Sequence, residues 1–231
     1  FLVRIATKNA NGFCFDPCCG TGTFARAFMN YKIEKNIPID SVYKTVFASD
    51  RQSFPLQIAG LATVSKDSVN LPAIVFQKNV FDLNVGDKIQ IVDPADWNIL
   101  DIELPQFDTI VSNLPFIDFC RHNTHEQSDI LAKSKVSKEI FENTEIQIND
   151  RSDYYMYIIF HLWKLLKNNG TACVLTSNAW MATAAGALFI NALSQYFTIK
   201  GVIKSGIGYT PSLSSKIERF WWIVETWIWR K

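Results

Sequence analysis

Short hydrophobic runs alternate along the chain with segments whose apolar residues recur at helical spacing. This pattern predicts strands at residues 13–16, 42–48, 73–77, 107–112, 171–176, 198–203 and 219–229. It predicts helices at residues 24–29, 54–65, 154–166 and 182–196, and a short one near 126–142 within a polar excursion at 117–151. Strands that alternate with helices favour an α/β fold, with one mostly parallel sheet of seven strands and helices on both faces.

The composition is that of one large globular domain. The chain has 231 residues, of which 48% are hydrophobic and 19% charged, and its formal net charge is +1. This charge excludes a uniformly basic surface, so any patch that binds nucleic-acid phosphates must be local. No apolar run reaches the roughly 18–20 residues that a membrane span needs, so no membrane partner is expected.

The five cysteines and three histidines follow no metal-binding or disulfide spacing. No two cysteines form a Cys-x-x-Cys pair, which argues against a structural zinc site, and no metal is expected. An odd number of cysteines without a framework spacing fits a reducing compartment, so a cytoplasmic location is predicted.

A glycine turn follows the first predicted strand, in Phe15-Asp16-Pro17-Cys18-Cys19-Gly20-Thr21-Gly22. Glycine lets the backbone approach a ligand closely, and the helix that follows begins with unpaired N–H groups. The spacing of Gly20, Gly22 and Ala25 also fits a dinucleotide-binding turn, in which alanine can replace the third glycine. However, an aspartate at the strand end would repel a pyrophosphate and suits an ammonium group. The turn therefore predicts a cofactor cradle, and the plainer alternative is a tight turn that binds nothing.

This turn resembles the S-adenosylmethionine motif of amino-group DNA methyltransferases, which is usually Asp-Pro-Ala/Cys-Cys-Gly-Ser/Thr-Gly. The resemblance implies a class I, Rossmann-like methyltransferase fold with S-adenosylmethionine as its cofactor. It implies that Asp16 binds the methionine amine. It also implies that the turn packs on the cofactor through Pro17, Cys18, Gly20, Thr21 and Gly22.

Two further strand ends carry polar residues that suit the same cofactor. Asp50 lies about 28 residues after Gly22, where α/β nucleotide sites hold ribose hydroxyls, and the family has an acid there too. The alternative role for Asp50 is to cap the following helix. After the third strand, the family places an Asp or Asn that reads the adenine amine beside an apolar residue. Asn79 or Asp82 fits the polar role and Phe81 the apolar one, with a solvated loop as the alternative.

The fourth predicted strand ends in Asn113-Leu114-Pro115-Phe116. The exocyclic amine of adenine is a weak nucleophile because its lone pair is delocalised into the ring. Two acceptors aimed at its hydrogens, the Asn113 side-chain oxygen and the Leu114 carbonyl, can draw the nitrogen toward sp³ character. Pro115 restricts the backbone, and Phe116 can stack on an extruded base. A lone segment of this kind is more often an ordinary turn at the end of a strand. It indicates a catalytic site only together with the glycine turn upstream.

The tetrapeptide resembles the Asn/Asp-Pro-Pro-Tyr/Phe catalytic motif of the same methyltransferases, with Leu114 in the first proline position. Because Asn-Leu-Pro-Tyr/Phe also resembles ribosomal RNA adenine dimethyltransferases, an RNA or other amino-group methyltransferase is an alternative. A catalytically inactive scaffold is a second alternative. The aspartate of the first motif, the long separation of the two motifs and the segment 177–181 favour DNA.

The resemblance therefore implies N6-adenine methylation of DNA in a restriction-modification system, by direct methyl transfer without a covalent enzyme intermediate. It implies that Phe116 and a second aromatic residue, Tyr209 or Phe220, enclose the target base. The expected partners are DNA and a specificity subunit or fused target-recognition domain. We expect the catalytic domain to occupy residues 1–231, and the target-recognition domain and an N-terminal segment to lie outside them.

Overall fold

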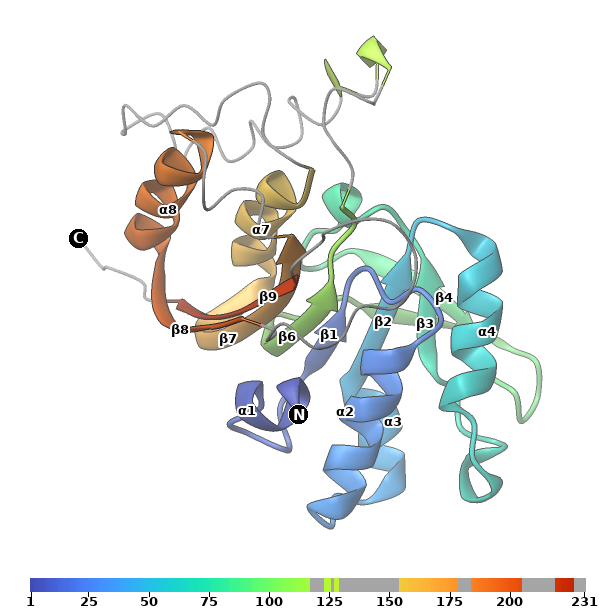
Figure 1. Ribbon diagram of the computed structural model, residues 1–231. Helices are drawn as coiled ribbons and strands as arrows, with labels where there is room; N and C mark the ends of the chain where they lie inside the picture. Colours follow the sequence, from blue (N-terminus) through green and yellow to red (C-terminus); the bar gives the residue numbers. More distant parts are fainter. Residues whose placement is uncertain (117–122, 126, 129–153, 178–183, 205–218, 227–231) are drawn as a thin grey trace, which may run out of the picture.

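Seven strands form the main sheet of the computed structural model, in the order β3-β2-β1-β6-β7-β9-β8 (Figure 1). The structure describes residues 1–116, 123–125, 127–128, 154–177, 184–204 and 219–226. The strands of this sheet are β1 (Cys14–Asp16), β2 (Val46–Asp50), β3 (Ile74–Gln77), β6 (Phe107–Asn113), β7 (Leu166–Ser177), β8 (Phe197–Lys204) and β9 (Arg219–Thr226). Strands β3, β2, β1, β6 and β7 run parallel, and β9 is antiparallel to both β7 and β8. The predicted α/β fold with a mostly parallel seven-stranded sheet is confirmed.

Helices cover both faces of this sheet. They are α1 (Leu2–Ala6), α2 (Thr23–Glu34), α3 (Ile39–Thr45), α4 (Ser53–Thr63), α7 (Tyr154–Leu165) and α8 (Ala184–Tyr196), with short 3₁₀ turns η1 (Lys66–Ser68) and η2 (Val80–Asp82). Successive strand residues enter different cores: Cys14 packs with α1 to α4 on one face, whereas Phe15 packs with α7 and α8 on the other (Figure 1). Burial on both faces explains why these strands are continuous hydrophobic runs.

Two strands begin well away from the predicted residue, and the helix predicted at 24–29 continues to Glu34. Residues 42–45 belong to α3, where Lys44 pairs with Asp40 one turn earlier at 2.6 Å, and the strand begins only at Val46. The helix before Gly170 ends at Leu165, and β7 begins at once at Leu166. Residues 168–170, Asn-Asn-Gly, lie within this strand, and the left-handed Asn169 (φ 64°) accompanies a shift in its pairing with β6.

An antiparallel hairpin of β4 (Lys88–Val92) and β5 (Ile99–Glu103) was not predicted. In β4 the burial alternates, with Ile89 and Ile91 in the core and their neighbours exposed, as in a strand with one solvated face. The predicted helix at 126–142 lies almost wholly outside the described residues, and the last strand is described only to Thr226.

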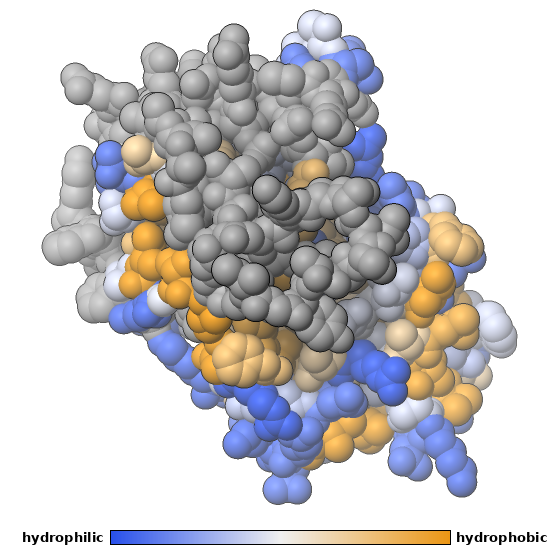
Figure 2. Space-filling model, in the orientation of Figure 1, coloured by the Kyte–Doolittle hydropathy of each residue, from blue (hydrophilic) through white to orange (hydrophobic). Residues whose placement is uncertain are grey.

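Exposed hydrophobic side chains gather over α4 (Figure 2). Phe54, Ile58 and Leu61 are spaced by one helical turn and point away from the core. Among the described residues, no helix is long and apolar enough to cross a membrane.

Candidate active site

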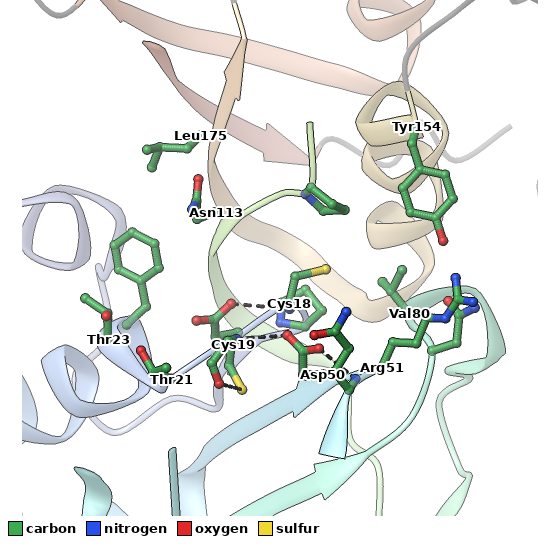
Figure 3. A pocket seen from close by; sticks show the side chains of 17 residues that line it. Cys18, Cys19, Thr21, Thr23, Asp50, Arg51, Val80, Asn113, Tyr154 and Leu175 are labelled. Carbon is green, nitrogen blue, oxygen red and sulfur yellow. Dashed lines mark hydrogen bonds between the residues drawn. The ribbon is translucent and has the colours of Figure 1, made fainter. Parts of the chain in front are cut away.

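A cavity of about 920 Å³ opens at the carboxyl ends of β1, β2, β6 and β7. Ligands of open α/β sheets bind at this edge. Figure 3 shows Asn113 on one side of the cavity, Tyr154 and Val80 across from it, and Cys18 and Asp50 close together between them. The lining residues are Asp16, Pro17, Cys18, Cys19, Gly20, Thr21, Thr23, Phe24, Asp50, Arg51, Gln52, Asn79, Val80, Asn113, Pro115, Tyr154 and Leu175.

The glycine turn has the backbone that its sequence predicts. Gly20 and Gly22 both have positive φ values, 51° and 84°, which other residues rarely adopt. A Cβ atom on Gly22 would lie 3.0 Å from the Cα of Ala59, so this glycine lets α2 pack closely on α4. Gly22 therefore shapes the turn from behind and does not line the cavity, whereas Gly20 and Thr21 do.

Hydrogen bonds fasten the turn to the end of β2. The Cys19 N–H donates to the Ser49 carbonyl and the Gly20 N–H to the Asp50 carboxylate, both at 2.9 Å. The Ser49 hydroxyl donates to the Pro17 carbonyl at 3.2 Å. Asp50 thus has a structural role beside its predicted ribose contact, and it also lines the cavity.

Asp16 is a buried acid at the wall of the cavity, with 1% of its surface exposed. Its Oδ1 accepts hydrogen bonds from the Ser112 hydroxyl at 2.7 Å and from the Cys18 N–H at 3.4 Å. Burial raises the pKa of Asp16 from 3.8 to about 7, although both hydrogen bonds favour the charged form. A cationic group beside this carboxylate would restore its full charge.

The loop after β3 places Asn79 and Val80 on the cavity wall. The Asn79 side chain also accepts a hydrogen bond from the Phe81 N–H at 3.2 Å and so begins η2. Phe81, predicted to lie against the cofactor ring, is instead 4% exposed, and Val80 takes the apolar position at the cavity. The 3₁₀ turn is the reason, because it directs Phe81 into contact with Tyr154 and His161 of α7.

His161 holds this loop from behind. Its Nε2 lies 2.9 Å from the Leu83 carbonyl, which can only accept, so Nε2 carries the proton. Burial lowers the pKa of His161 from 6.5 to about 4, and the imidazole is therefore neutral near pH 7. No sequence pattern indicated this contact, which depends on how α7 docks on η2.

We expect His161→Ala to weaken cofactor binding about two- to fivefold and to destabilise the fold by about 1–3 kcal/mol, because the Leu83 carbonyl loses its buried donor. His161→Gln, whose amide can donate to the same carbonyl, should recover most of both losses. Calorimetric titration and urea unfolding measure the two effects. Equal cofactor affinity in wild type and His161→Ala would refute the inference that His161 holds the loop after β3 in place for the cofactor.

The predicted catalytic segment divides between the cavity and the core. Asn113 and Pro115 line the cavity, and the Asn113 side chain is exposed to it. Leu114 is 1% exposed, and its N–H donates to the Leu175 carbonyl at 3.3 Å. Phe116 is half-buried, with its ring edge-to-face on Tyr155 at 6.5 Å between centroids, and it is not part of the cavity wall.

The burial of Leu114 and the hydrogen bond of its N–H explain why proline does not suit this position, where the related motif has its first proline. Proline has no N–H, so Leu114→Pro would lose the bond to β7 as well as a buried side chain. We expect it to lower the free energy of unfolding by at least about 2 kcal/mol. Leu114→Met keeps the N–H and the volume and should cost less than about 1.5 kcal/mol. Urea unfolding compares them, and equal losses would contradict this explanation.

The two candidates for the second aromatic residue at the base remain predictions. Tyr209 lies outside the described residues. The backbone of Phe220 pairs with Thr176 in the sheet, and the structure does not describe its side chain. Site residues that the sequence did not single out come from neighbouring turns and from α7: Thr23, Phe24, Arg51, Gln52, Tyr154 and, behind Asp16, Ser112.

The cysteines beside the cavity are poor nucleophiles. Burial raises the thiol pKa of Cys18 and of Cys19 well above the ordinary value, and the nearby Asp16 and Asp50 raise both further. Both side chains are therefore neutral thiols near pH 7. Within the described part of the chain, no group of three or more His, Cys, Asp or Glu side chains is placed to hold a metal ion.

The fold is shared with solved structures of a methyltransferase and of restriction-modification proteins. A protein of Listeria monocytogenes, described as a class I S-adenosylmethionine-dependent methyltransferase, superposes with a TM-score of 0.63 at 17% identity, over 98% of this chain and 57% of its own. A modification subunit assigned to a type I restriction enzyme of Vibrio vulnificus gives 0.62 at 15% identity, over 98% and 42%. The type ISP enzyme LlaBIII, bound to DNA, gives 0.65 at 16% identity, over 96% and 17%. No curated protein matches the sequence.

The chain therefore has the class I methyltransferase fold. The profile of the Eco57I restriction-modification methylase family matches residues 44–207, more than half of the sequence, and the chain belongs to that family. Its cofactor is S-adenosylmethionine. The chain spans only part of the solved relatives, about 57% of the Listeria protein and less of the restriction enzymes.

Proposed function

We propose that this domain transfers the methyl group of S-adenosylmethionine to the N6 amine of an adenine in DNA, as part of a restriction-modification system. One observation carries the proposal. Asp16, which suits an ammonium group, and Asn113, which suits an amino group, line one cavity from the ends of adjacent strands β1 and β6. The family membership supports methylation in restriction-modification.

The residues of the cavity fit the cofactor. Asp16 provides the carboxylate for its amine, and Gly20 lines the cavity without a side chain, with nothing within 4 Å of the position that a Cβ would take. Asp50 offers acceptor oxygens for ribose hydroxyls, and Asn79 and Val80 offer a polar and an apolar surface for adenine. When bound, S-adenosylmethionine supplies a methyl group on a positively charged sulfur.

The end of β6 fits the base. The Asn113 side-chain oxygen accepts a hydrogen bond from the amino group, and the Leu114 carbonyl accepts a second. These acceptors make the nitrogen more nucleophilic and hold it in place for direct attack, so no thiol or metal need take part. Phe116 follows at once, and its contact with Tyr155 limits the directions from which it can stack on an extruded base.

DNA recognition would belong largely to other parts of the protein. The related restriction enzymes are longer, and some of their structures contain DNA, as with LlaBIII and the type IIL enzyme MmeI. We propose that a specificity subunit or a fused target-recognition domain selects the sequence, while this domain binds the cofactor and the extruded adenine.

Methyl transfer from radiolabelled S-adenosylmethionine tests the proposal, using the domain within its full-length protein. Unmethylated genomic DNA and total RNA are offered separately, and the products are digested to nucleosides for mass spectrometry. N6-methyladenine in DNA is the expected product. Label confined to RNA would favour an enzyme of the ribosomal RNA type, which the Asn-Leu-Pro-Phe segment also resembles. Cofactor binding without methyl transfer to DNA or RNA would favour a scaffold.

A further inference from the structure

Ser112 makes a contact that neither sequence motif explains. Its hydroxyl donates to Oδ1 of Asp16 at 2.7 Å, and both side chains are buried. Asp16 lies at the end of β1, and Ser112 lies on the neighbouring strand β6 directly before Asn113. This hydrogen bond therefore joins the acid that faces the cofactor to the strand that carries the catalytic amide.

Both described hydrogen bonds to the Asp16 carboxylate end on the same oxygen. Ser112 and the Cys18 N–H, the latter at a longer 3.4 Å, approach Oδ1. A carboxylate held through one oxygen has a fixed orientation and keeps its second oxygen available for a ligand in the cavity that Asp16 lines. Because Ser112 makes the shorter bond, it is the main orienting group.

The surroundings of Asp16 otherwise oppose its negative charge. Its carboxyl is fully buried, and the nearby carboxylate of Asp50 carries a charge of the same sign. Of the groups that favour the ionised form, the Ser112 hydroxyl has the largest effect on the pKa of Asp16, ahead of the Cys18 N–H. A hydroxyl is also neutral, so it supports the carboxylate without competing for the ammonium of the ligand.

We propose that Ser112 is a positioning residue for cofactor binding, which orients the Asp16 carboxylate through their buried hydrogen bond so that it can receive the amine of S-adenosylmethionine. The inference rests on the proposed role of Asp16. Serine is small and can donate at this depth, whereas alanine would leave Oδ1 with the long Cys18 bond alone.

Ser112→Ala tests this through the pH dependence of cofactor affinity. Without the hydroxyl, Asp16 should ionise at higher pH, so the ratio of variant to wild-type dissociation constants should depend on pH. We expect the ratio to be about five to ten at pH 6.5 and to fall to about two or less at pH 8.5, as the carboxyl ionises in both proteins. Calorimetric titrations across this range measure it.

Ser49→Ala is the matched control. Ser49 is another fully buried serine whose hydroxyl bonds the same turn, at the Pro17 carbonyl, rather than the Asp16 carboxylate. Any loss of affinity in Ser49→Ala should be the same at every pH. Ser112→Thr, which keeps the hydroxyl, should restore the wild-type profile, and it protects the test against a folding defect in Ser112→Ala.

The cofactor-free protein gives a second measurement. The ¹³Cγ resonance of Asp16 should titrate at higher pH in Ser112→Ala than in wild type. Equal midpoints and a pH-independent ratio of affinities would overturn the role of Ser112 while leaving Asp16 as the cofactor acid. Failure of the wild type to bind S-adenosylmethionine at any pH would instead overturn the proposed site, and this inference with it.

Discussion

Asn113→Ala is expected to lower the rate constant of methyl transfer by about 10²–10³-fold, the usual cost of removing one group that stabilises a transition state. The side-chain oxygen of Asn113 is the proposed acceptor for the adenine amine, and alanine has no acceptor to replace it. Asn113 is exposed at the cavity, so its loss should leave the core intact. Cofactor affinity should change by no more than about twofold, because Asp16, Asp50 and the glycine turn stay in place.

Single-turnover kinetics with saturating cofactor and DNA isolates this chemical step. Asn113→Asp keeps an acceptor of the same size and should retain more activity than Asn113→Ala. Asn98→Ala is a control for general effects, because Asn98 is bonded to Asp96 in the β4–β5 hairpin and does not line the cavity. A rate for Asn113→Ala within threefold of wild type would exclude Asn113 from catalysis.

The part of the site that the sequence predicted comes from contiguous segments at strand ends. Asp16, Gly20, Asp50, Asn79 and Asn113 each follow a hydrophobic run, and the carboxyl ends of parallel strands meet at one edge. Knowing the strand order was unnecessary for this prediction. The alternating pattern of strands and helices indicated that the strand ends meet, and the resemblance to the methyltransferase motifs indicated which residues at those ends to choose.

The missed residues depend on how separate elements pair and dock. Ser112 contacts Asp16 only because β1 and β6 are neighbours, and that order does not follow from the order along the chain. Tyr154 and His161 reach the site through the docking of α7 on η2. Phe81 was assigned to the cavity because a linear pattern cannot show which of two adjacent apolar residues a 3₁₀ turn directs outward.

The missed elements are short segments with conflicting local signals. Val42 and Tyr43 suit either a strand or a helix, and the charged pair of Asp40 and Lys44 agrees with the helix observed. The hairpin of β4 and β5 alternates over only five residues in each strand, within a polar stretch. The large parallel strands were easier to predict because burial on both faces makes them continuously apolar.

Asp16→Asn is expected to weaken S-adenosylmethionine binding at least tenfold near pH 7.5, which corresponds to about 1.4 kcal/mol. Asparagine has nearly the same shape and still offers an oxygen to Ser112 and Cys18, so the substitution removes mainly the charge. Charge-assisted hydrogen bonds to an ammonium group are about twice as strong as neutral ones. The substitution should therefore lower the affinity for the cofactor while leaving the structure of the site unchanged.

The same substitution should make the cofactor-free protein more stable at pH 8. The pKa of Asp16 is raised to about 7 by burial, so between about pH 4 and 7 the folded protein holds a proton that the unfolded chain has released. The contribution of Asp16 to the free energy of unfolding consequently falls as the pH rises through this window. The asparagine side chain of the variant cannot ionise, so thermal unfolding at pH 8 should occur at a higher temperature in Asp16→Asn than in wild type.

Cofactor binding in wild type should itself depend on pH with a maximum. Below about pH 7 the acid is protonated, and binding must release that proton, so affinity should fall by up to tenfold per pH unit. Above about pH 8 the free amine of the cofactor loses its charge, and affinity should fall again. Titrations in buffers of different ionisation enthalpy should detect about one released proton at pH 6, and Asp16→Asn should lose this release together with the acidic limb. A wild-type affinity that is constant from pH 5.5 to 8 would mean that Asp16 does not receive the amine, because a carboxyl buried this deeply cannot bind a cation without first giving up its proton.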